Sequence, residues 1–286
     1  MVTGGSGFLG RRTVPRLVAA GFDVSVLCRS NRASEVVSAM GATPRRGDLD
    51  RDDTVAGAFD TARGGTLVNL ASLGFGHAST IVSAAEAADL RRAVFVSTTG
   101  IFTALNAPSR PVRLDAEETI RSSTLDWTIV RPTMIYGRPG DRNLERLVRL
   151  VRRSPVIPLP GGGHGLQQPV HVDDLADAVV RCVERRSTIG RCFDLAGPEP
   201  MTLRDVVDTT AVAVGRKVTL VPVPLRPAVI GAKVYERVTG RRGLRAEQLE
   251  RLGEHKAFDI SAAEDALGYR PRPFPDGMRL EVSLLR

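Results

Sequence analysis

Three glycines at the beginning of the chain are the residues whose type and spacing most clearly suggest a chemical role. Gly4, Gly7 and Gly10 have the spacing G-x-x-G-x-x-G within the segment Met1-Val-Thr-Gly-Gly-Ser-Gly-Phe-Leu-Gly10. They follow an apolar strand end and open a helical run, which is the setting that gives this pattern meaning. Glycine lets the backbone turn sharply towards a pyrophosphate, and the N–H groups of the helix N-terminus bind its oxygens. The segment therefore predicts a dinucleotide-binding loop that includes Phe8 and Leu9; the alternative is a glycine turn without a ligand.

Such a loop needs a strand before it and a helix after it, and the sequence alternates between these elements. Strands are predicted to end at Thr3, Cys28, Gly47, Leu70, Val96 and Val130. Helices are predicted at 8–20, 34–40, 54–59, 80–89 and 115–122. This alternation predicts an α/β fold with a doubly wound parallel sheet, whose ligands lie at the carboxyl ends of the strands. Only three residues precede the glycines, so we expect the first strand to be truncated or its true start to lie upstream.

The character of the chain changes after Arg131, where prolines and the run Gly161-Gly-Gly163 mark loops. We therefore expect residues 1–135, completed by 168–197, to form the dinucleotide-binding domain. Residues 136–167 and 198–286 are predicted to form a smaller C-terminal lobe that binds substrate.

Composition limits the class of protein. The chain has 286 residues, of which 42% are hydrophobic, as expected for a folded globular protein. No apolar run is long enough to span a membrane and no secretory signal is visible, so a cytoplasmic location is expected. The three cysteines are odd in number and lack metal-type spacing, so no metal site is suggested.

The net charge of +8 comes from scattered arginines, with no nucleic-acid-binding motif. We therefore expect an anionic small-molecule partner and no nucleic acid, with a homodimer as a further expectation. A peripheral membrane role for the basic segment 226–245 competes with the simpler interpretation of a solvated helix.

Several further segments of the chain are similar to motifs of one known protein superfamily. They are Gly47-Asp-Leu49, Asn69-Leu-Ala71, Val96-Ser-Thr98, Val130-Arg-Pro-Thr-Met-Ile-Tyr-Gly137, Pro169-Val-His-Val-Asp-Asp174, Asp194-Leu-Ala-Gly197, Phe258-Asp-Ile-Ser261 and Ala266-Leu-Gly-Tyr269. With the glycine loop, they make nearly the whole chain resemble the extended short-chain dehydrogenase/reductase superfamily, in particular its atypical, epimerase/dehydratase-like members. The resemblance implies a Rossmann domain that binds NAD(P).

The resemblance also implies cofactor contacts beyond the glycine loop, at Asp48, Leu49, Leu70, Ala71, Ser72 and Pro132. Asp48 could accept a hydrogen bond from the adenine amino group while Leu49 packs on the ring. Arg29 stands where an acidic residue would bind the ribose 2′-hydroxyl of NAD, and an arginine there suits a 2′-phosphate. NADP is therefore expected, with NAD as the alternative; the simpler interpretation of Arg29 is a solvated turn residue.

For catalysis, the resemblance implies a Ser or Thr after the fifth strand, and Thr98 fits, with Ser97 and Thr99 as alternatives. It also implies a Tyr-x-x-x-Lys pair, in which the cation lowers the pKa of the phenol so that it can exchange protons. This chain contains no such pair, since its tyrosines are followed four residues later by Gly140, Thr239 and Pro273. The family's spacing places Arg113 where the lysine would be and Ser109 where the tyrosine would be. Arg113 could bind the ribose, but a guanidinium does not shuttle protons.

Other groups could take over the proton transfer, and Tyr136, His77, His164 and His171 are the alternatives. His171 is expected to be structural, and Asp173 and Asp174 to cap a helix. The expected function is thus an NAD(P)-dependent epimerase/dehydratase-like or reductase enzyme acting on a nucleotide-sugar or similar anionic molecule. The alternative is a non-catalytic NAD(P)-binding protein, such as a cofactor sensor or an assembly subunit.

Overall fold

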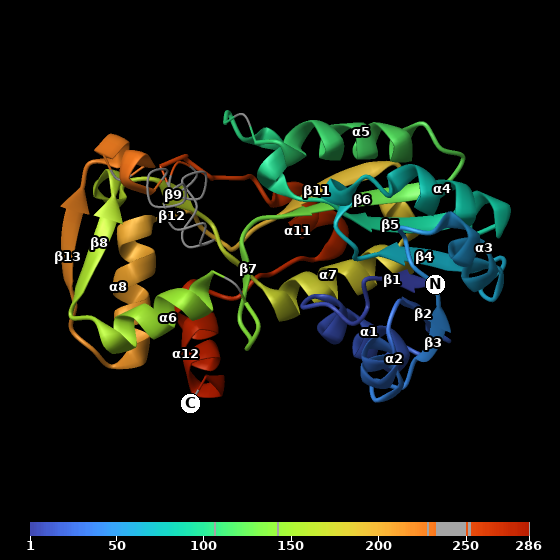
Figure 1. Cartoon of the computed structure of the whole chain (residues 1–286), viewed down its shortest axis with the longest axis horizontal. Coiled ribbons are helices and arrows are strands. Elements are labelled where there is room, and N and C mark those ends of the chain that lie inside the picture. The colour runs from blue at the N-terminus through green and yellow to red at the C-terminus, as the bar shows by residue number, and fades with distance from the viewer. Residues whose placement is uncertain (106, 142, 228, 233–249, 251–252, 286) are drawn as a thin grey trace.

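A seven-stranded parallel sheet forms the centre of the protein (Figure 1). The computed structural model describes residues 1–286 except 106, 142, 228, 233–249, 251–252 and 286. The strand order is β3-β2-β1-β4-β5-β6-β11. The bounds are β1 Val2–Thr3, β2 Ser25–Cys28, β3 Thr43–Arg46, β4 Thr66–Asn69, β5 Arg92–Val96, β6 Asp126–Pro132 and β11 Arg191–Leu195. From β1 the chain builds the sheet first towards β3 and then, from β4, towards β11 on the other side. The loops after β1 and β4 therefore lead away from each other, and a crevice between them is the usual ligand site of such sheets.

Helices cover both faces of the sheet, as the apolar periodicity of the sequence predicts (Figure 1). One apolar core holds side chains of α1 (Gly10–Ala19), α2 (Asn31–Ser38), α7 (Val172–Glu184) and α11 (Ser261–Leu267). The other holds those of α3 (Asp52–Asp60), α4 (Ala78–Ala87) and α5 (Ser109–Arg121). The predicted α/β fold with a doubly wound parallel sheet is confirmed.

Two short 3₁₀ turns follow the central strands at their carboxyl ends. The first, η1 (Leu73–Phe75), comes after β4, and the second, η2 (Thr99–Phe102), comes after β5. Helix α5 then begins at Ser109, six residues earlier than predicted. Pro108 and Pro111 obscured this start in the sequence, although proline is well tolerated in the first turn of a helix. As a result Arg113 lies on a regular helix.

A smaller lobe extends from the carboxyl edge of the sheet and has its own apolar cores (Figure 1). Its helices are α6 (Leu144–Arg153), α8 (Leu203–Val214) and α12 (Phe274–Leu284). Its two-stranded sheets pair β8 (Val156–Pro160) with β13 (Thr219–Val223), and β9 (Leu166–Gln167) with β12 (Met201–Thr202). A third pair, β7 (Ile135–Tyr136) with β10 (Val170–His171), lies where the chain passes between the two parts. Two further 3₁₀ turns are η3 (Gly161–Gly163) and η4 (Arg186–Thr188).

One part of the predicted lobe belongs with the sheet. We predicted that all of 198–286 would lie in the lobe, but Ile260, Ala263, Leu267 and Tyr269 are buried in the core beside α7 and β11. The Tyr269 hydroxyl donates to the Ala196 carbonyl at 2.8 Å. The apolar side of α11 thus covers the sheet. No local pattern in the sequence predicts that this late segment packs there.

The basic segment 226–245, considered above for a membrane role, lies mostly outside the described residues. Within the residues that are described, no helix is long and apolar enough to cross a bilayer.

Candidate dinucleotide and catalytic site

The glycine loop passes so close to its neighbours that two of its glycines have no room for a side chain. Gly4 has a positive φ of 70°, and a Cβ added there would lie 2.6 Å from the Ala71 backbone nitrogen. A Cβ at Gly10 would lie 2.3 Å from the Gly5 carbonyl oxygen. Gly7 differs, because it is exposed and an added Cβ would meet only the Gly4 carbonyl oxygen, at 3.1 Å. The open side of the loop therefore lies at Gly7, where a ligand can approach the backbone.

The same loop leaves hydrogen-bond donors at the start of α1. The first bond of the helical type runs from the Arg11 N–H to the Gly7 carbonyl, at 3.0 Å. The N–H groups of Phe8, Leu9 and Gly10 come before this bond, so they make no hydrogen bond to a carbonyl one helical turn earlier. Together with the positive end of the helix dipole, they suit the two negative charges of a pyrophosphate.

Asn69, at the end of β4, holds the loop against the neighbouring strand and was not predicted as a site residue. Its side-chain oxygen accepts a hydrogen bond from the buried Thr3 hydroxyl at 2.5 Å, and its amide donates to the Ala71 carbonyl at 3.0 Å. This brings Leu70 and Ala71 against Gly4. The available signal was a polar residue at the end of an otherwise apolar strand.

The loop after β3 presents Asp48 at the sheet edge. One carboxylate oxygen accepts the Asp50 N–H at 3.2 Å, and the Asp48 N–H donates to the Thr54 hydroxyl at 2.9 Å. Leu49 is partly buried against the apolar core. The turn is therefore fixed, and the hydrogen bond from an adenine amino group to Asp48 stays a prediction.

Three arginines surround the start of α2, beside the end of β2. Arg29 and Arg32 are exposed, and Arg46 of β3 donates to the Asn31 side chain at 3.3 Å. Cys28 and Arg46 are register partners at the ends of neighbouring strands, and Arg29 directly follows Cys28. The first turn of α2 contains no acidic residue. This edge is therefore suited to an anion.

At the end of β5, three consecutive hydroxyl groups have different surroundings. Ser97 donates to buried Glu117 at 2.6 Å, and Thr99 donates to the Pro132 carbonyl at 3.3 Å. Thr98 is half-buried, and its oxygen accepts the Gly100 N–H at 3.1 Å. Since accepting a bond leaves its hydrogen available, Thr98 is the member of the three that is best placed to bind a reacting oxygen.

Glu117 of α5 is fully buried and joins the ends of two strands. Besides Ser97, it accepts two hydrogen bonds from Arg131, at 3.0 and 2.6 Å, and one from Arg121 at 2.6 Å. Burial alone would raise the pKa of Glu117, but the bonds from Arg131 and Ser97 outweigh it and hold the pKa below its usual value. This cluster fixes α5 to β5 and β6, and it was not predicted from the sequence.

Arg113 lies one helical turn before Glu117 and contacts the turn after β4. A Cβ added at Gly74, in η1, would lie 3.0 Å from Arg113 Nε. The Arg113 guanidinium thus lies on η1, while Thr98 begins η2 on the neighbouring strand. Ser109 is on the same helix, at its first residue. The structure therefore brings Arg113 and Thr98 to adjacent turns of the sheet edge.

Tyr136 does not lie at this edge. Its ring is buried in the smaller lobe against His171 and Phe274, with ring centroids 5.3 and 5.2 Å away. Its hydroxyl is so close to Gly277 that an added Cβ there would lie 2.1 Å away. Burial raises the pKa of Tyr136 far above its usual value. The predicted role of Tyr136 in proton transfer therefore needs correction. Its phenol is buried away from the sheet edge and stays protonated, so it cannot exchange protons with a ligand there.

The predicted histidines have different surroundings. His77 stands at the start of α4 just after η1, with its ring centroid 6.4 Å from that of Phe75, and its Nε2 lies 3.4 Å from a carboxylate oxygen of Asp50 in the loop after β3. His164 is exposed at the end of η3. His171 is fully buried and caps α7, since its Nδ1 accepts the Asp173 N–H at 3.2 Å. That geometry confirms the structural role expected for His171 and requires a neutral ring.

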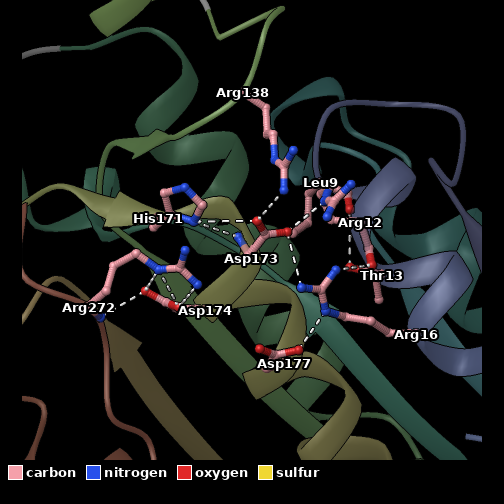
Figure 2. Close-up of polar contacts among 10 residues, drawn as sticks. All are labelled: Leu9, Arg12, Thr13, Arg16, Arg138, His171, Asp173, Asp174, Asp177 and Arg272. Atoms are coloured by element: carbon pink, nitrogen blue, oxygen red, sulfur yellow. Dashed lines mark hydrogen bonds and ion pairs between the residues drawn. The ribbon is translucent and has the colours of Figure 1, made fainter. Parts of the chain in front are cut away.

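Asp173 gathers arginines from distant parts of the chain (Figure 2). Arg12 donates to it at 2.6 Å, Arg16 at 3.1 Å and Arg138 at 3.1 Å. Burial would raise the pKa of Asp173, but the bonds from Arg12 and Arg138 lower it to about 2. The cluster fixes the N-terminal half of α1 to α7 and to the loop after β7. Beside it, Asp174 pairs with Arg272 at 2.7 Å.

Stability should fall in acid because of His171. Burial lowers its pKa from 6.5 to about 4. Between these values the unfolded chain binds a proton that the folded chain does not, so stability present above pH 6.5 is lost as the pH falls towards 4. The loss is about 3 kcal/mol at most, at about 1.4 kcal/mol per pKa unit.

Urea denaturation between pH 4 and 7 measures this loss. His171→Asn keeps a side-chain acceptor for the cap but cannot titrate, so its stability should change less with pH. His164→Asn is the matched control, and it should retain the slope of the natural protein. Equal slopes for the natural protein and His171→Asn would contradict the assignment.

The residues at the sheet edge fit a dinucleotide: an open glycine loop with free N–H donors, a fixed Asp48 turn and a basic edge at Arg29. Comparison with known proteins agrees. A model of the NAD(P)H-binding family matches residues 4–186. This chain belongs to that family. The resemblance to the atypical, epimerase-like short-chain dehydrogenases/reductases is likewise confirmed.

The proteins that this chain is similar to differ in their named activities. The chain is 27% identical over 266 residues to 4-hydroxy-2-methyl-3-oxo-4-farnesyl-3,4-dihydroquinoline-1-oxide ketoreductase from Stigmatella aurantiaca, covering 82% of this chain and 79% of the relative. Its fold is similar to an NADPH-dependent quinone oxidoreductase from Escherichia coli (TM-score 0.77, 19% identity, 99% and 98% covered). It is also similar to a UDP-glucuronic acid 4-epimerase from Bacillus cereus in complex with UDP-glucuronic acid and NAD (TM-score 0.77, 15% identity, 99% and 98% covered). At these identities the two structures establish the fold alone.

Proposed function

We propose that this NAD(P)H-binding protein is an NADP-dependent oxidoreductase that reduces a small-molecule carbonyl compound. The observation that carries the proposal is the position of Arg113 on η1, next to the turn that begins with Thr98. A hydroxyl donor and a fixed cation then lie on neighbouring turns at the edge that the glycine loop also occupies. Both groups suit an oxygen that gains negative charge.

The choice of NADP is supported by Arg29, Arg32 and Arg46. A 2′-phosphate carries a charge that guanidinium groups bind with paired hydrogen bonds. The exposed edge between β2 and α2 offers these groups, with no acid in the first turn of α2.

The bound nicotinamide would supply a hydride to the substrate. Thr98 would hydrogen-bond the substrate oxygen, while Arg113 would bind ribose hydroxyls and stabilise the developing charge. Reduction is favoured over epimerisation because epimerases of this kind rely on a base to remove a proton, and neither Ser109 nor Arg113 can serve as one. The ketoreductase name of the relative from Stigmatella aurantiaca supports the same direction.

The test has two stages. NADPH binding is measured first by nicotinamide fluorescence. Single-turnover loss of nicotinamide absorbance is then followed with a panel of cyclic ketones, quinones and UDP-glucuronic acid. Loss of absorbance with any acceptor supports the proposal. Tight NADPH binding with no loss for any acceptor would overturn it and favour the non-catalytic alternative, which the absence of Tyr-x-x-x-Lys already makes plausible.

Cofactor preference should depend on Arg29. In Arg29→Asp, a carboxylate replaces the cation and repels the 2′-phosphate, while it can accept bonds from the free 2′-hydroxyl of NADH. The ratio of NADPH to NADH affinity should fall about 100-fold, since hydrogen bonds to charged groups contribute about 1.5–3 kcal/mol each. Fluorescence titration with both cofactors measures it. Arg63→Asp, on the surface after α3, is the control, and an unchanged ratio in Arg29→Asp would show that the 2′-phosphate binds elsewhere.

A further inference from the structure

Three buried acidic side chains meet where helix α12 of the smaller lobe packs against the loop after β7 (137–141). They are Asp141 of that loop, Glu145 of α6 and Glu281 of α12, and they are 5%, 7% and 0% exposed. Asp141 and Glu145 both lie close enough to Glu281 to raise its pKa. Acidic side chains are seldom buried without a partner, because an ionised carboxylate loses its hydration when it leaves water. The cluster therefore needs groups that offset its charge.

Two of the three acids have hydrogen-bond donors. The Asp141 carboxylate caps α6 and accepts the Asn143 N–H at 2.7 Å, with two further N–H groups of the first helical turn at 3.0 and 3.3 Å. Glu145 accepts the Gly140 N–H at 2.8 Å and pairs with Arg149. Hydrogen bonds to the charged form favour it, so both acids can stay ionised in the interior.

Glu281 differs from the other two acids, because neither of its carboxyl oxygens has a hydrogen-bond partner within the described part of the chain. The side chain that faces it, Asp141, is itself an acceptor. A protonated Glu281 resolves this contact, since a carboxylic acid O–H donates to a carboxylate, whereas two ionised carboxylates repel each other. Burial and the charge of Asp141 raise the pKa of Glu281 to about 8, and the nearby Gly137 N–H, which acts in the opposite sense, is outweighed. The proton therefore belongs on Glu281.

Among the described residues, no cation around Glu281 takes the place of this proton. From β7 and β10, the elements beside α12, come the neutral phenol of Tyr136 and the neutral ring of His171. From α6, Arg152 donates to two carbonyl groups near the end of α12. The remaining charged side chains on α6, α8 and α12 are exposed: Arg146, Arg153, Arg204, Asp205, Asp208, Asp276 and Arg279. Arg142 lies outside the described residues and is tested below as a variant.

The loop after β7 also contacts the glycine loop and helix α1. A Cβ added at Gly140 would lie 3.9 Å from the Phe8 ring carbon Cδ2. Arg138 of the same loop donates to Asp173, which also binds Arg12 of α1 (Figure 2). Phe8 is one of the residues whose N–H group is open to a pyrophosphate. A displacement of the loop after β7 would therefore disturb the proposed dinucleotide site.

We propose that Glu281 and Asp141 share one proton and thereby position the loop after β7 for dinucleotide binding, so that NADPH affinity falls when the pair loses this proton. With both acids ionised, their repulsion at close contact favours separation of α12 from the loop. Glu281 is a positioning residue, because it acts through the loop and does not itself contact the cofactor. The inference goes beyond the proposed function, since it concerns cofactor binding and does not depend on whether a carbonyl compound is reduced.

The first experiment measures NADPH affinity by fluorescence titration between pH 7 and 9.5. The Kd of the natural protein should rise about 10-fold, because binding then requires the uptake of a proton, and one linked proton changes Kd by up to about tenfold per pH unit. Glu281→Gln keeps an N–H donor for Asp141 but cannot titrate, so its Kd should change by less than about 2-fold.

Two variants serve as controls. Glu118→Gln, on the exposed side of α5, should retain the rise in Kd, and so should Arg142→Gln. An equal rise in Glu281→Gln and the natural protein, or loss of the rise in Arg142→Gln, would overturn the inference. If NADPH binds with the expected pH dependence but no acceptor is reduced, the proposed function fails while this inference stands.

Folding stability should depend on the same proton. The folded chain keeps it up to about pH 8, whereas the unfolded chain releases it near the ordinary value of 4.5, so the contribution of Glu281 to stability is lost as the pH rises between these values. This trend is opposite to that of His171. In urea denaturation, Glu281→Gln should therefore become more stable relative to the natural protein as the pH rises from 6.5 to 8.5. A constant difference over this range would contradict the shared proton.

Infrared spectroscopy detects the proton directly and needs no cofactor. The C=O stretching band of a protonated carboxyl group should be present at pH 7, where ordinary carboxylates are ionised. It should disappear as the pH rises through about 8 and should be absent from Glu281→Gln. Asp194→Asn is the control, because burial also raises the pKa of Asp194, and this variant should retain the band. No band in the natural protein, or a band that persists in Glu281→Gln, would show that Glu281 is ionised and would overturn the inference.

Discussion

Replacing Glu117 with alanine should destabilise the protein by about 3–5 kcal/mol, because it leaves the Arg131 guanidinium buried without its carboxylate. Ser97 would lose its hydrogen-bond acceptor in the same change. Typical folded domains are stable by about 5–15 kcal/mol, so this loss is a large fraction of the total. Urea denaturation at pH 7 measures it.

The neighbouring residue provides the control. Glu118 is exposed on the same helix, and Glu118→Ala should change stability by no more than about 0.5 kcal/mol. The double variant Glu117→Met with Arg131→Met removes both charges, so it should cost less than the sum of the single changes. A loss below about 1 kcal/mol in Glu117→Ala would contradict the buried ion cluster.

Replacing Gly10 with alanine should affect both stability and cofactor binding. The new Cβ would lie 2.3 Å from the Gly5 carbonyl oxygen and 2.5 Å from that of Gly4, so the loop backbone must move. Such overpacking costs about 1–3 kcal/mol. NADPH binding should weaken about 10-fold or more, because the N–H groups of Phe8 and Leu9 move with the loop. Denaturation and fluorescence titration measure the two effects.

Gly7→Ala separates these two effects. Its Cβ would meet only the Gly4 carbonyl oxygen, at 3.1 Å, so stability should change by less than about 1 kcal/mol. NADPH affinity should nonetheless fall, because the methyl group occupies the approach to the phosphates. Unchanged NADPH binding in Gly7→Ala would show that the pyrophosphate does not lie against this loop.

Local signals in the sequence were sufficient for the fold and for placing the proposed cofactor residues at one edge of the sheet. Glycine spacing and strand–helix alternation arise from neighbouring residues, so Gly4, Gly7 and Gly10 could be placed before the structure was known. The position of Asp48 followed for the same reason, because parallel strands end at a common edge. Proline distribution, in contrast, misled the prediction of where α5 begins.

Contacts between distant residues could not be predicted in this way. Glu117 and Ser97 are 20 residues apart, and Asp173 and Arg12 are 161 apart. Tyr136 illustrates the consequence: its sequence position after β6 suggested the site, but packing of α12 against β7 buried it in the lobe core.

The amino-acid sequence by itself determined the doubly wound sheet, the dinucleotide loop and the lack of a Tyr-x-x-x-Lys pair, since each depends on residue types at short spacing. The tertiary structure alone decided which hydroxyl stays available after β5, where Arg113 lies, and which acids are buried together. Burial and ion pairing set these outcomes, and both depend on side chains that meet only when the chain has folded.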